Sequence, residues 1–135
     1  MSTALYSHPE CRLHDMGEGH PECPHRLDAI NDRLLVSGLQ DVLDLRAAPL
    51  VDIQALTRAH ESRYVSELED LLEQISAGTE SRYIDPDTVA CPATWRAALR
   101  SAGAAVAATD AVIKGEVENA FCAVRPPGHH ATRNQ

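Results

Sequence analysis

Apolar residues recur at helical spacing in several stretches of the chain. The first is "HRLDAINDRLLVSGL", residues 25–39, which begins after a proline and closes on a glycine. The second is "ESRYVSELEDLLEQISAG", residues 61–78, and the third is the alanine-rich stretch 93–115. Small residues in the third stretch would let that helix pack closely on a sheet. A shorter helix is expected over residues 51–60.

Short apolar runs predict strands at residues 3–7, 43–48 and 119–124. The last run, "NAFCAV", is expected to form a central strand. Residues 8–25 are rich in Pro, Gly and His, so we expect a loop there, and we expect irregular structure over 79–92. Strands alternate with helices and no hairpin signal is present. This order favours a layered α/β domain with a parallel sheet.

Three predicted strands are few for a sheet with helices on both faces. We therefore expect residues 1–135 to form the N-terminal part of a larger domain that is incomplete at its C-terminus. A sheet of this kind would leave a strand edge and helix faces open, so we expect poor solubility, oligomerisation or dependence on a partner. Trp95 and Phe121 are expected in the core, and Cys122 is expected to be buried and unreactive.

Composition narrows the classes of function. The net charge of -8 argues against direct nucleic-acid binding through a broad basic face, but it tolerates a cationic amine as substrate. No run approaches the ~20 apolar residues of a membrane span, and the N-terminus lacks a signal-peptide pattern. The 4 cysteines are dispersed. We therefore expect reduced thiols and a cytoplasmic protein.

The tetrapeptide HPEC occurs twice, at residues 8–11 and 20–23. Two histidines and two cysteines at matching spacing suggest a small structural zinc site, with His14 and His25 as further ligands. The α/β pattern of the rest of the chain does not need a metal for folding. A small metal-binding module therefore stays open as an alternative.

The stretch "AVRPPGHHA" places His129 and His130 directly after the last predicted strand. Ligand sites of open parallel sheets gather beyond the carboxyl ends of the strands. Pro126 and Pro127 stiffen this segment, and Gly128 permits a tight turn. Adjacent imidazoles can divide labour, one as general base and one as electrostatic support. The alternative is a histidine pair that is merely exposed on a loop.

The motif "RPPGHHA" resembles that of the histone deacetylase and acetylpolyamine amidohydrolase family. "GHPECPHRL" at 19–27 resembles the loop before the family's first helix, and "LTRAHESRYV" at 56–65 resembles a second element. The segment that begins "DPDTVACPATWRAAL" resembles the approach to the family's long helix. These pieces occur in the family's order over nearly the whole chain, and they are closest to the class II-like bacterial branch. The resemblance implies an arginase/deacetylase-like three-layer fold.

The family's reaction is zinc-dependent hydrolysis of an acetyl amide, so the resemblance implies Zn²⁺ as cofactor. The substrate would be an acetylated amine, either an acetyl-lysine peptide or an acetylpolyamine. By motif position His130 would be the general base, and His129 would stabilise charge. These are the residues that the resemblance makes catalytic.

The resemblance also implies pocket residues. Glu22 and Pro24 would line the pocket mouth, and Arg26 would line an internal cavity behind the metal. Asp87 would lie at a rim position that binds the substrate backbone. The alternative for Arg26 is a helix residue paired with Asp28 or Glu22. The alternative for Asp87 is a turn residue in "DPDT".

The family's zinc ligands and its carbonyl-polarising tyrosine follow the tandem histidines, beyond Gln135. We therefore predict that residues 1–135 alone hold no catalytic zinc and have no deacetylase activity. A complementing C-terminal half would be needed as partner. The alternative is a non-catalytic fragment that only binds partners.

Overall fold

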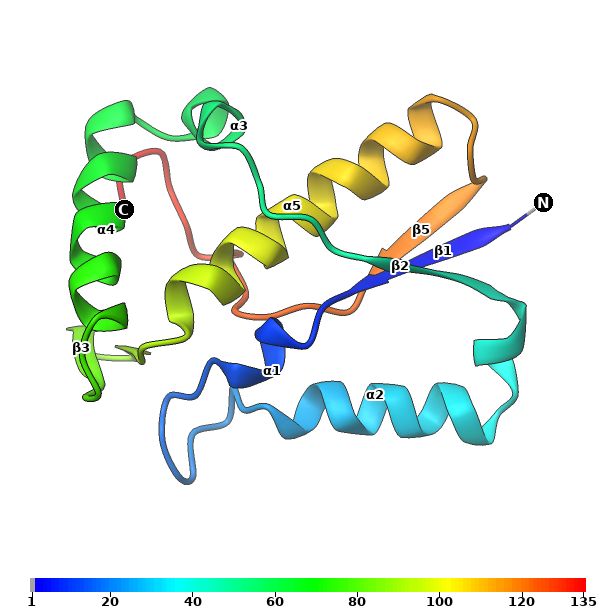
Figure 1. The fold of residues 1–135 in the computed structure, drawn as a ribbon, viewed down its shortest axis with the longest axis horizontal. Coiled ribbons are helices and arrows are strands. Elements are labelled where there is room, and N and C mark those ends of the chain that lie inside the picture. Colours follow the sequence, from blue (N-terminus) through cyan, green and yellow to red (C-terminus); the bar gives the residue numbers. More distant parts are fainter. Residues whose placement is uncertain (1) are drawn as a thin grey trace.

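A parallel sheet forms the centre of the computed structural model, which describes residues 2–135 (Figure 1). The strand order is β2-β1-β5, with β1 (Thr3–Ser7) between β2 (Leu43–Ala47) and β5 (Asn119–Cys122). Leu5 of β1 lies opposite Leu45 on one side and Phe121 on the other. The predicted parallel sheet is confirmed. The predicted central place of 119–124 is wrong within this sheet, because β1 is central and β5 is an edge strand.

The long helix α5 (Thr94–Ile113) covers one face of the sheet (Figure 1). Gly103 shows how closely the helix packs against the segment that follows β2: a Cβ added there would lie 2.0 Å from the backbone oxygen of Pro49. The small side chains of the helix therefore let backbones approach, as predicted. The core on this face is built mainly from small residues: Ala4, Tyr6, Ala48, Ala104, Ala108, Ala111 and Val117.

Helix α2 (His25–Val36) lies on the opposite face. It ends at the predicted position, where Gly38 adopts a φ of 71° before the short 3-10 helix η1 (Leu39–Val42). Leu5 and Leu27 are buried between this helix and the sheet. Phe121 is 56% exposed, so its predicted place in the core is wrong. The physical reason is its position on edge strand β5, where the part of the face beyond α2 is uncovered.

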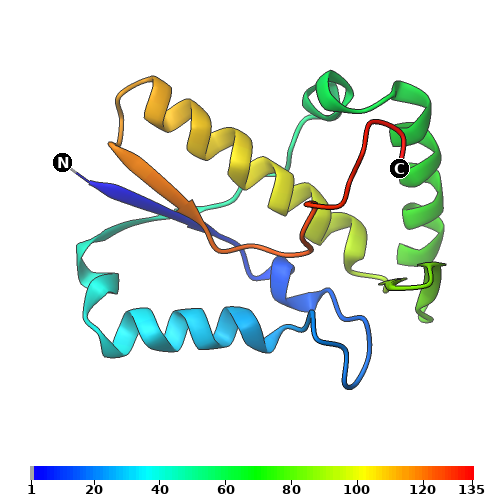
Figure 2. The same cartoon turned by 180° about the vertical axis from the view of Figure 1, so that it is seen from behind.

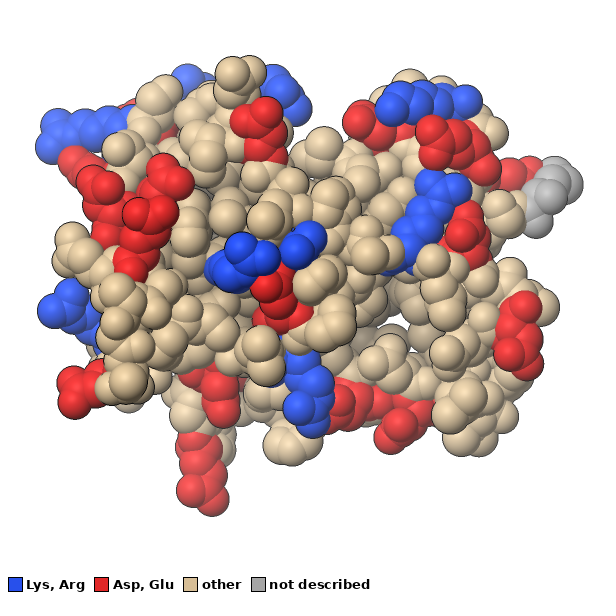
Figure 3. Space-filling view, viewed as in Figure 1, with Lys and Arg blue, Asp and Glu red and all other residues tan. Residues whose placement is uncertain are grey.

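Helices α3 (Ile53–Ala59) and α4 (Ser62–Ser76) form a second cluster beside the start of α5. Asp52 caps α3 by accepting a hydrogen bond from the backbone N–H of Gln54. Trp95 is buried against Leu72 and Ile75, which confirms its predicted core position. Acidic side chains gather over the outer side of α4 (Figure 3). The predicted amphipathic helix is confirmed.

Two segments predicted as irregular contain regular structure. Residues 79–92 include an antiparallel hairpin of β3 (Arg82–Asp85) and β4 (Thr88–Ala90), which the sequence reading missed. The loop over 8–25 begins with the short helix α1 (Glu10–Leu13). Both elements are too short to produce a periodic apolar pattern. No helix in the described part of the chain is long and apolar enough to cross a bilayer.

Candidate functional site

The tandem histidines lie on the segment that follows β5. This segment leaves the sheet, crosses α5 and approaches α4 (Figure 2). The rings of His129 and His130 lie 4.2 Å apart, measured between centroids, at a tilt of 48°. Both residues are exposed within this chain. The structure therefore brings the two imidazole rings next to each other on one exposed segment, where both could face the same bound molecule.

Hydrogen bonds hold the backbone of this segment in place, although its two histidine rings are exposed. Ser101 Oγ of α5 donates to the carbonyl oxygen of Pro126 at 2.9 Å. Beyond the histidines, His60 Nδ1 lies 2.8 Å from the carbonyl oxygen of Thr132. The next backbone bond joins the N–H of Glu61 to the carbonyl of Arg133 at 2.8 Å. The α3–α4 corner therefore holds the far end of the histidine loop, here defined as residues 125–133.

Arg125 holds the near end of the histidine loop. Its side chain is completely buried, with Nε 2.8 Å and Nη2 2.7 Å from the two carboxylate oxygens of Glu22. Its Nη1 donates to the carbonyl oxygens of Cys11, at 3.1 Å, and His14. Burial opposes ionisation of Glu22, but the guanidinium of Arg125 holds the pKa of Glu22 below its ordinary value. The pair is therefore charged and bidentate.

A second buried polar group lies next to this pair. His14 Nδ1 lies 2.8 Å from Thr94 Oγ1, which also accepts from the backbone N–H of Cys91. His14 Nε2 is buried without a hydrogen-bond partner, 3.8 Å from a Glu22 oxygen. Burial opposes ionisation of the Cys91 thiol, but hydrogen bonds from His14 and Thr94 lower its pKa to about 6. The chain therefore contains an acidified thiol that its sequence did not indicate.

The expected pocket residues lie in different places. Arg26 Nη2 donates to the carbonyl oxygen of Val124 at 2.7 Å, directly before the histidine loop. Neither acidic partner considered for Arg26 binds it, because Asp28 pairs with Arg12 and Glu22 pairs with Arg125.

An apolar hollow of about 550 Å³ lies beside Arg26, between α2 and the sheet, and Phe121 lines it too. Pro24 is the N-cap residue of α2. Asp87 lies in the exposed turn between β3 and β4, where its N–H donates to Asp85. That geometry is the turn in "DPDT" considered as the alternative.

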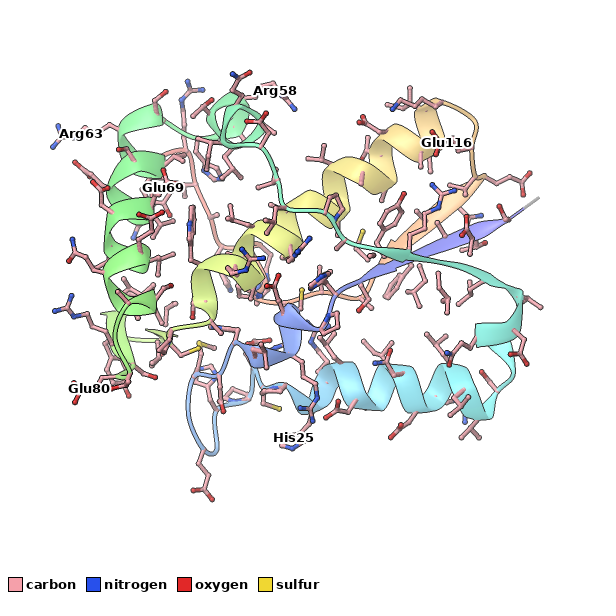
Figure 4. The ribbon with its side chains drawn as sticks, viewed as in Figure 1. His25, Arg58, Arg63, Glu69, Glu80 and Glu116 are labelled. Atoms are coloured by element: carbon pink, nitrogen blue, oxygen red, sulfur yellow. The ribbon has the colours of Figure 1, made fainter. Side chains whose placement is uncertain are left out.

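The HPEC repeats do not form one site. Cys11 is buried with its Sγ 4.0 Å from the carbonyl oxygen of Ala97, whereas Cys23 lies half-buried in the loop before α2. His25 points outward at the start of α2 (Figure 4). Within residues 2–135 there is no group of three His, Cys, Asp or Glu side chains that could hold a metal ion. The side chains described therefore do not fit a zinc site by themselves.

Sequence reasoning missed the residues that support the histidine loop. Arg125 was visible only as the first letter of "RPPGHHA", and His14 only as a reserve ligand. The one available signal was the place of Arg125 directly after the apolar run 119–124, where a long cationic side chain that becomes buried must find a buried partner. Its partner, Glu22, lies 103 positions away, and that distance is invisible to local patterns.

Comparisons with known proteins identify the family. Residues 20–135 match the model described as histone deacetylase domain. The chain is 38% identical over 117 residues to a histone deacetylase-like amidohydrolase from Pseudomonas aeruginosa, covering 87% of this chain and 30% of that protein. It is 35% identical to a probable deacetylase from Archaeoglobus fulgidus, covering 97% of this chain and 35% of that protein.

Two further matches extend the picture. The polyamine deacetylase HDAC10 of Rattus norvegicus is 32% identical, with 96% of this chain and 21% of that protein covered. The crystal structure of the HDA15 HD domain superposes with a TM-score of 0.87 at 33% identity. That match covers 98% of this chain and 37% of the other, so the chain spans about a third or less of these relatives. It has the N-terminal part of the arginase/deacetylase-like fold, and it belongs to the histone deacetylase domain family.

Proposed function

We propose that residues 1–135 supply the general base of a zinc-dependent deacetylase that hydrolyses an acetylated lysine or an acetylated polyamine. The observation that carries the proposal is the pair of adjacent imidazoles on a fastened loop beyond the sheet. Family membership supports hydrolysis of an acetyl amide, because relatives are a histone deacetylase-like amidohydrolase and polyamine deacetylases. The net charge of -8 suits a cationic amine as substrate.

In this proposal His130 takes the proton from the attacking water, and His129 stabilises the charge that develops beside it. Zinc would polarise the amide carbonyl and the water when bound. Residues 2–135 contain no fitting set of ligands, so the proposal places the ligands outside this chain. Alone, the 135-residue chain is therefore proposed to be inactive. We also propose that the protein is cytoplasmic and that its thiols are reduced.

A chimera tests the proposal most sharply. Residues 1–135 would replace the corresponding part of the Pseudomonas aeruginosa amidohydrolase, which this chain matches over 117 residues. Acetate release from acetyl-lysine peptide and from acetylpolyamine is then measured with zinc present. We expect turnover by the chimera, none by the 135-residue chain, and a loss of ~10²-fold or more in His130→Ala.

The matched control is His25→Ala, which removes an exposed histidine at the start of α2. It should leave turnover unchanged. A folded chimera that keeps full activity after His130→Ala would refute the assignment of the base. Turnover by the 135-residue chain alone would refute the placement of the zinc ligands.

A non-catalytic fragment that binds a partner is the second candidate. The observation that favours it is the uncovered apolar surface around Phe121 and the adjoining hollow of about 550 Å³. An inactive but folded chimera, with the 135-residue chain still forming a stable complex with the separately expressed remainder of the amidohydrolase, would favour this candidate.

A further inference from the structure

We infer that the Glu22–Arg125 ion pair is a positioning element, which sets the orientation of the histidine rings through the backbone of the histidine loop. The inference rests on the proposed function, since it concerns the pair of rings assigned to proton transfer. It also gives Glu22 a different role from a pocket-mouth residue. Both carboxylate oxygens of Glu22 are engaged by Arg125, so the side chain acts through the arginine.

Four hydrogen-bond acceptors hold the side chain of Arg125 in one geometry. Its guanidinium is completely buried and donates to Glu22 through two nitrogens and to two backbone carbonyls through the third. A buried charge without partners is strongly disfavoured, so rotation of this side chain would cost every one of these contacts at once. The planar fork of arginine matches a carboxylate in two-point contact, which fixes angle as well as distance.

The carbonyls bound by Arg125 belong to the short helix α1 and its C-terminal end. Cys11 lies within α1, and His14 is its C-cap residue. The last carbonyls of a helix lack partners within the helix, and a cation placed there satisfies them. Arg125 therefore joins the start of the histidine loop both to α1 and to the loop that carries Glu22.

The backbone between Arg125 and the two histidine rings has little conformational freedom. Pro126 and Pro127 fix their own φ angles, and Gly128 is the one residue in between without such a restriction. Ser101 also holds the carbonyl of Pro126. A change in the direction of Arg125 therefore moves the rings that follow, whereas the far end of the histidine loop stays attached at His60.

The experiment compares two substitutions that each remove one buried or half-buried carboxylate charge. Glu22→Gln weakens the pair with Arg125. Glu10→Gln is the matched control, because Glu10 also binds two guanidinium nitrogens, those of Arg96 and Arg100, and neither arginine bonds to the histidine loop. Histidine-labelled 135-residue chains are studied by NMR, with ring chemical shifts and contacts between the two rings as readout. Thermal melts report stability separately.

We expect Glu22→Gln to shift both ring resonances and to weaken the cross-peaks between the rings, with β1 and α5 still folded. Glu10→Gln should lower the melting temperature and leave the rings unchanged. Glu22→Asp keeps the charge and should restore most of the parent ring spectrum. Unchanged rings in Glu22→Gln would overturn the inference.

Unfolding of Glu22→Gln would also be informative, because a second variant then decides the inference. If Glu22→Gln unfolds while Glu10→Gln folds, Glu22→Asp serves as the second variant. A folded Glu22→Asp chain, with changes in ring chemical shift smaller than those of a denatured chain, supports the inference. An unfolded Glu22→Asp chain overturns it. In the latter case the pair holds the whole fold and not the histidine loop. Because the readout needs no turnover, the inference can fail while the chimera remains active, and the converse also holds.

Discussion

Helix α5 packs directly against one face of the sheet, whereas α2 is separated from much of the other face by hollows. On the α5 side, small residues of the helix pack on Ala4 and Tyr6 of β1, and Gly103 has no room for a Cβ beside Pro49 in the segment that follows β2. On the α2 side, one hollow of about 550 Å³ is lined by Phe121, and another of about 430 Å³ is lined by Leu27 and Leu45. The two faces therefore differ in shape fit at the sheet: small residues close the contact between α5 and β1, whereas α2 leaves hollows between its side chains and the strands.

The largest effect is expected on the tight face. Gly103→Ala would place a methyl group 2.0 Å from a backbone oxygen, and backbone cannot move aside as a flexible side chain can. We expect a loss of ~3 kcal/mol in the free energy of unfolding, measured by urea denaturation. Ala105→Leu on the exposed side of α5 is the control and should change little. A stability within error of the parent for Gly103→Ala would show that α5 does not seat as closely as described.

The α2 face should tolerate loss of volume better. Leu27 is buried but borders a hollow, so Leu27→Ala should cost only ~2 kcal/mol, near the low end for such truncations. Leu72→Ala removes the same atoms from a similarly buried position beside Trp95 and should cost more. Urea denaturation of both variants checks the order. Equal losses would contradict the contrast between a filled and an open surrounding.

An intermediate, pH-dependent effect is expected where α1 meets α5. Hydrogen bonds from Arg96 and then Arg100 lower the pKa of Glu10 from 4.5 to about 2. A lowered pKa means that this contribution is complete above pH 4.5 and is lost as the pH falls toward 2. Glu10→Gln should cost ~1 kcal/mol at pH 7 and progressively less below pH 4. Thermal melts across this range test it, and a difference that grows in acid would contradict it.

The smallest effect on stability, with the clearest effect on behaviour, is expected at the open edge. Phe121→Ser removes an aromatic ring that is 56% exposed, so stability should change by less than ~0.5 kcal/mol. Self-association, measured by sedimentation at several concentrations, should decrease because the apolar surface is smaller. The control Tyr83→Ser removes another exposed aromatic residue, from the β3–β4 hairpin, and should not alter association. Self-association that is unaffected by Phe121→Ser would show that the apolar surface responsible for it lies elsewhere.

Local sequence patterns predicted most of the helices and strands, but they predicted few of the contacts in the site. Periodicity located α2, α4 and α5, and the expected short helix over residues 51–60 contains α3, because each signal lies within one element. The hairpin and α1 escaped because elements of three or four residues show no period. The exposure of Phe121 depends on which strand lies next to β5, and that is a property of the assembled sheet.

The site illustrates the same limit. "RPPGHHA" located the histidine loop, but the groups that hold it come from distant parts of the chain: Glu22, His60, Ser101 and the backbone near His14. The sequence likewise did not indicate the partners of an ion pair on the surface. Arg46 of β2 binds Glu116, just beyond α5, at 3.0 Å, and Figure 4 places Glu116 at that end of the molecule. Charge alone did not indicate which partner each residue would take.

The contact between Glu22 and Arg125 has a consequence for how the protein folds. Its two partners are separated by 103 positions, so the bond cannot form until the segments around Glu22 and Arg125 have both left the ribosome. Contacts between such distant segments form late and slow the approach to the native state. Until then a carboxylate and a helix end near the N-terminus remain hydrated. We therefore expect the histidine loop to take its shape only after these two distant segments have met.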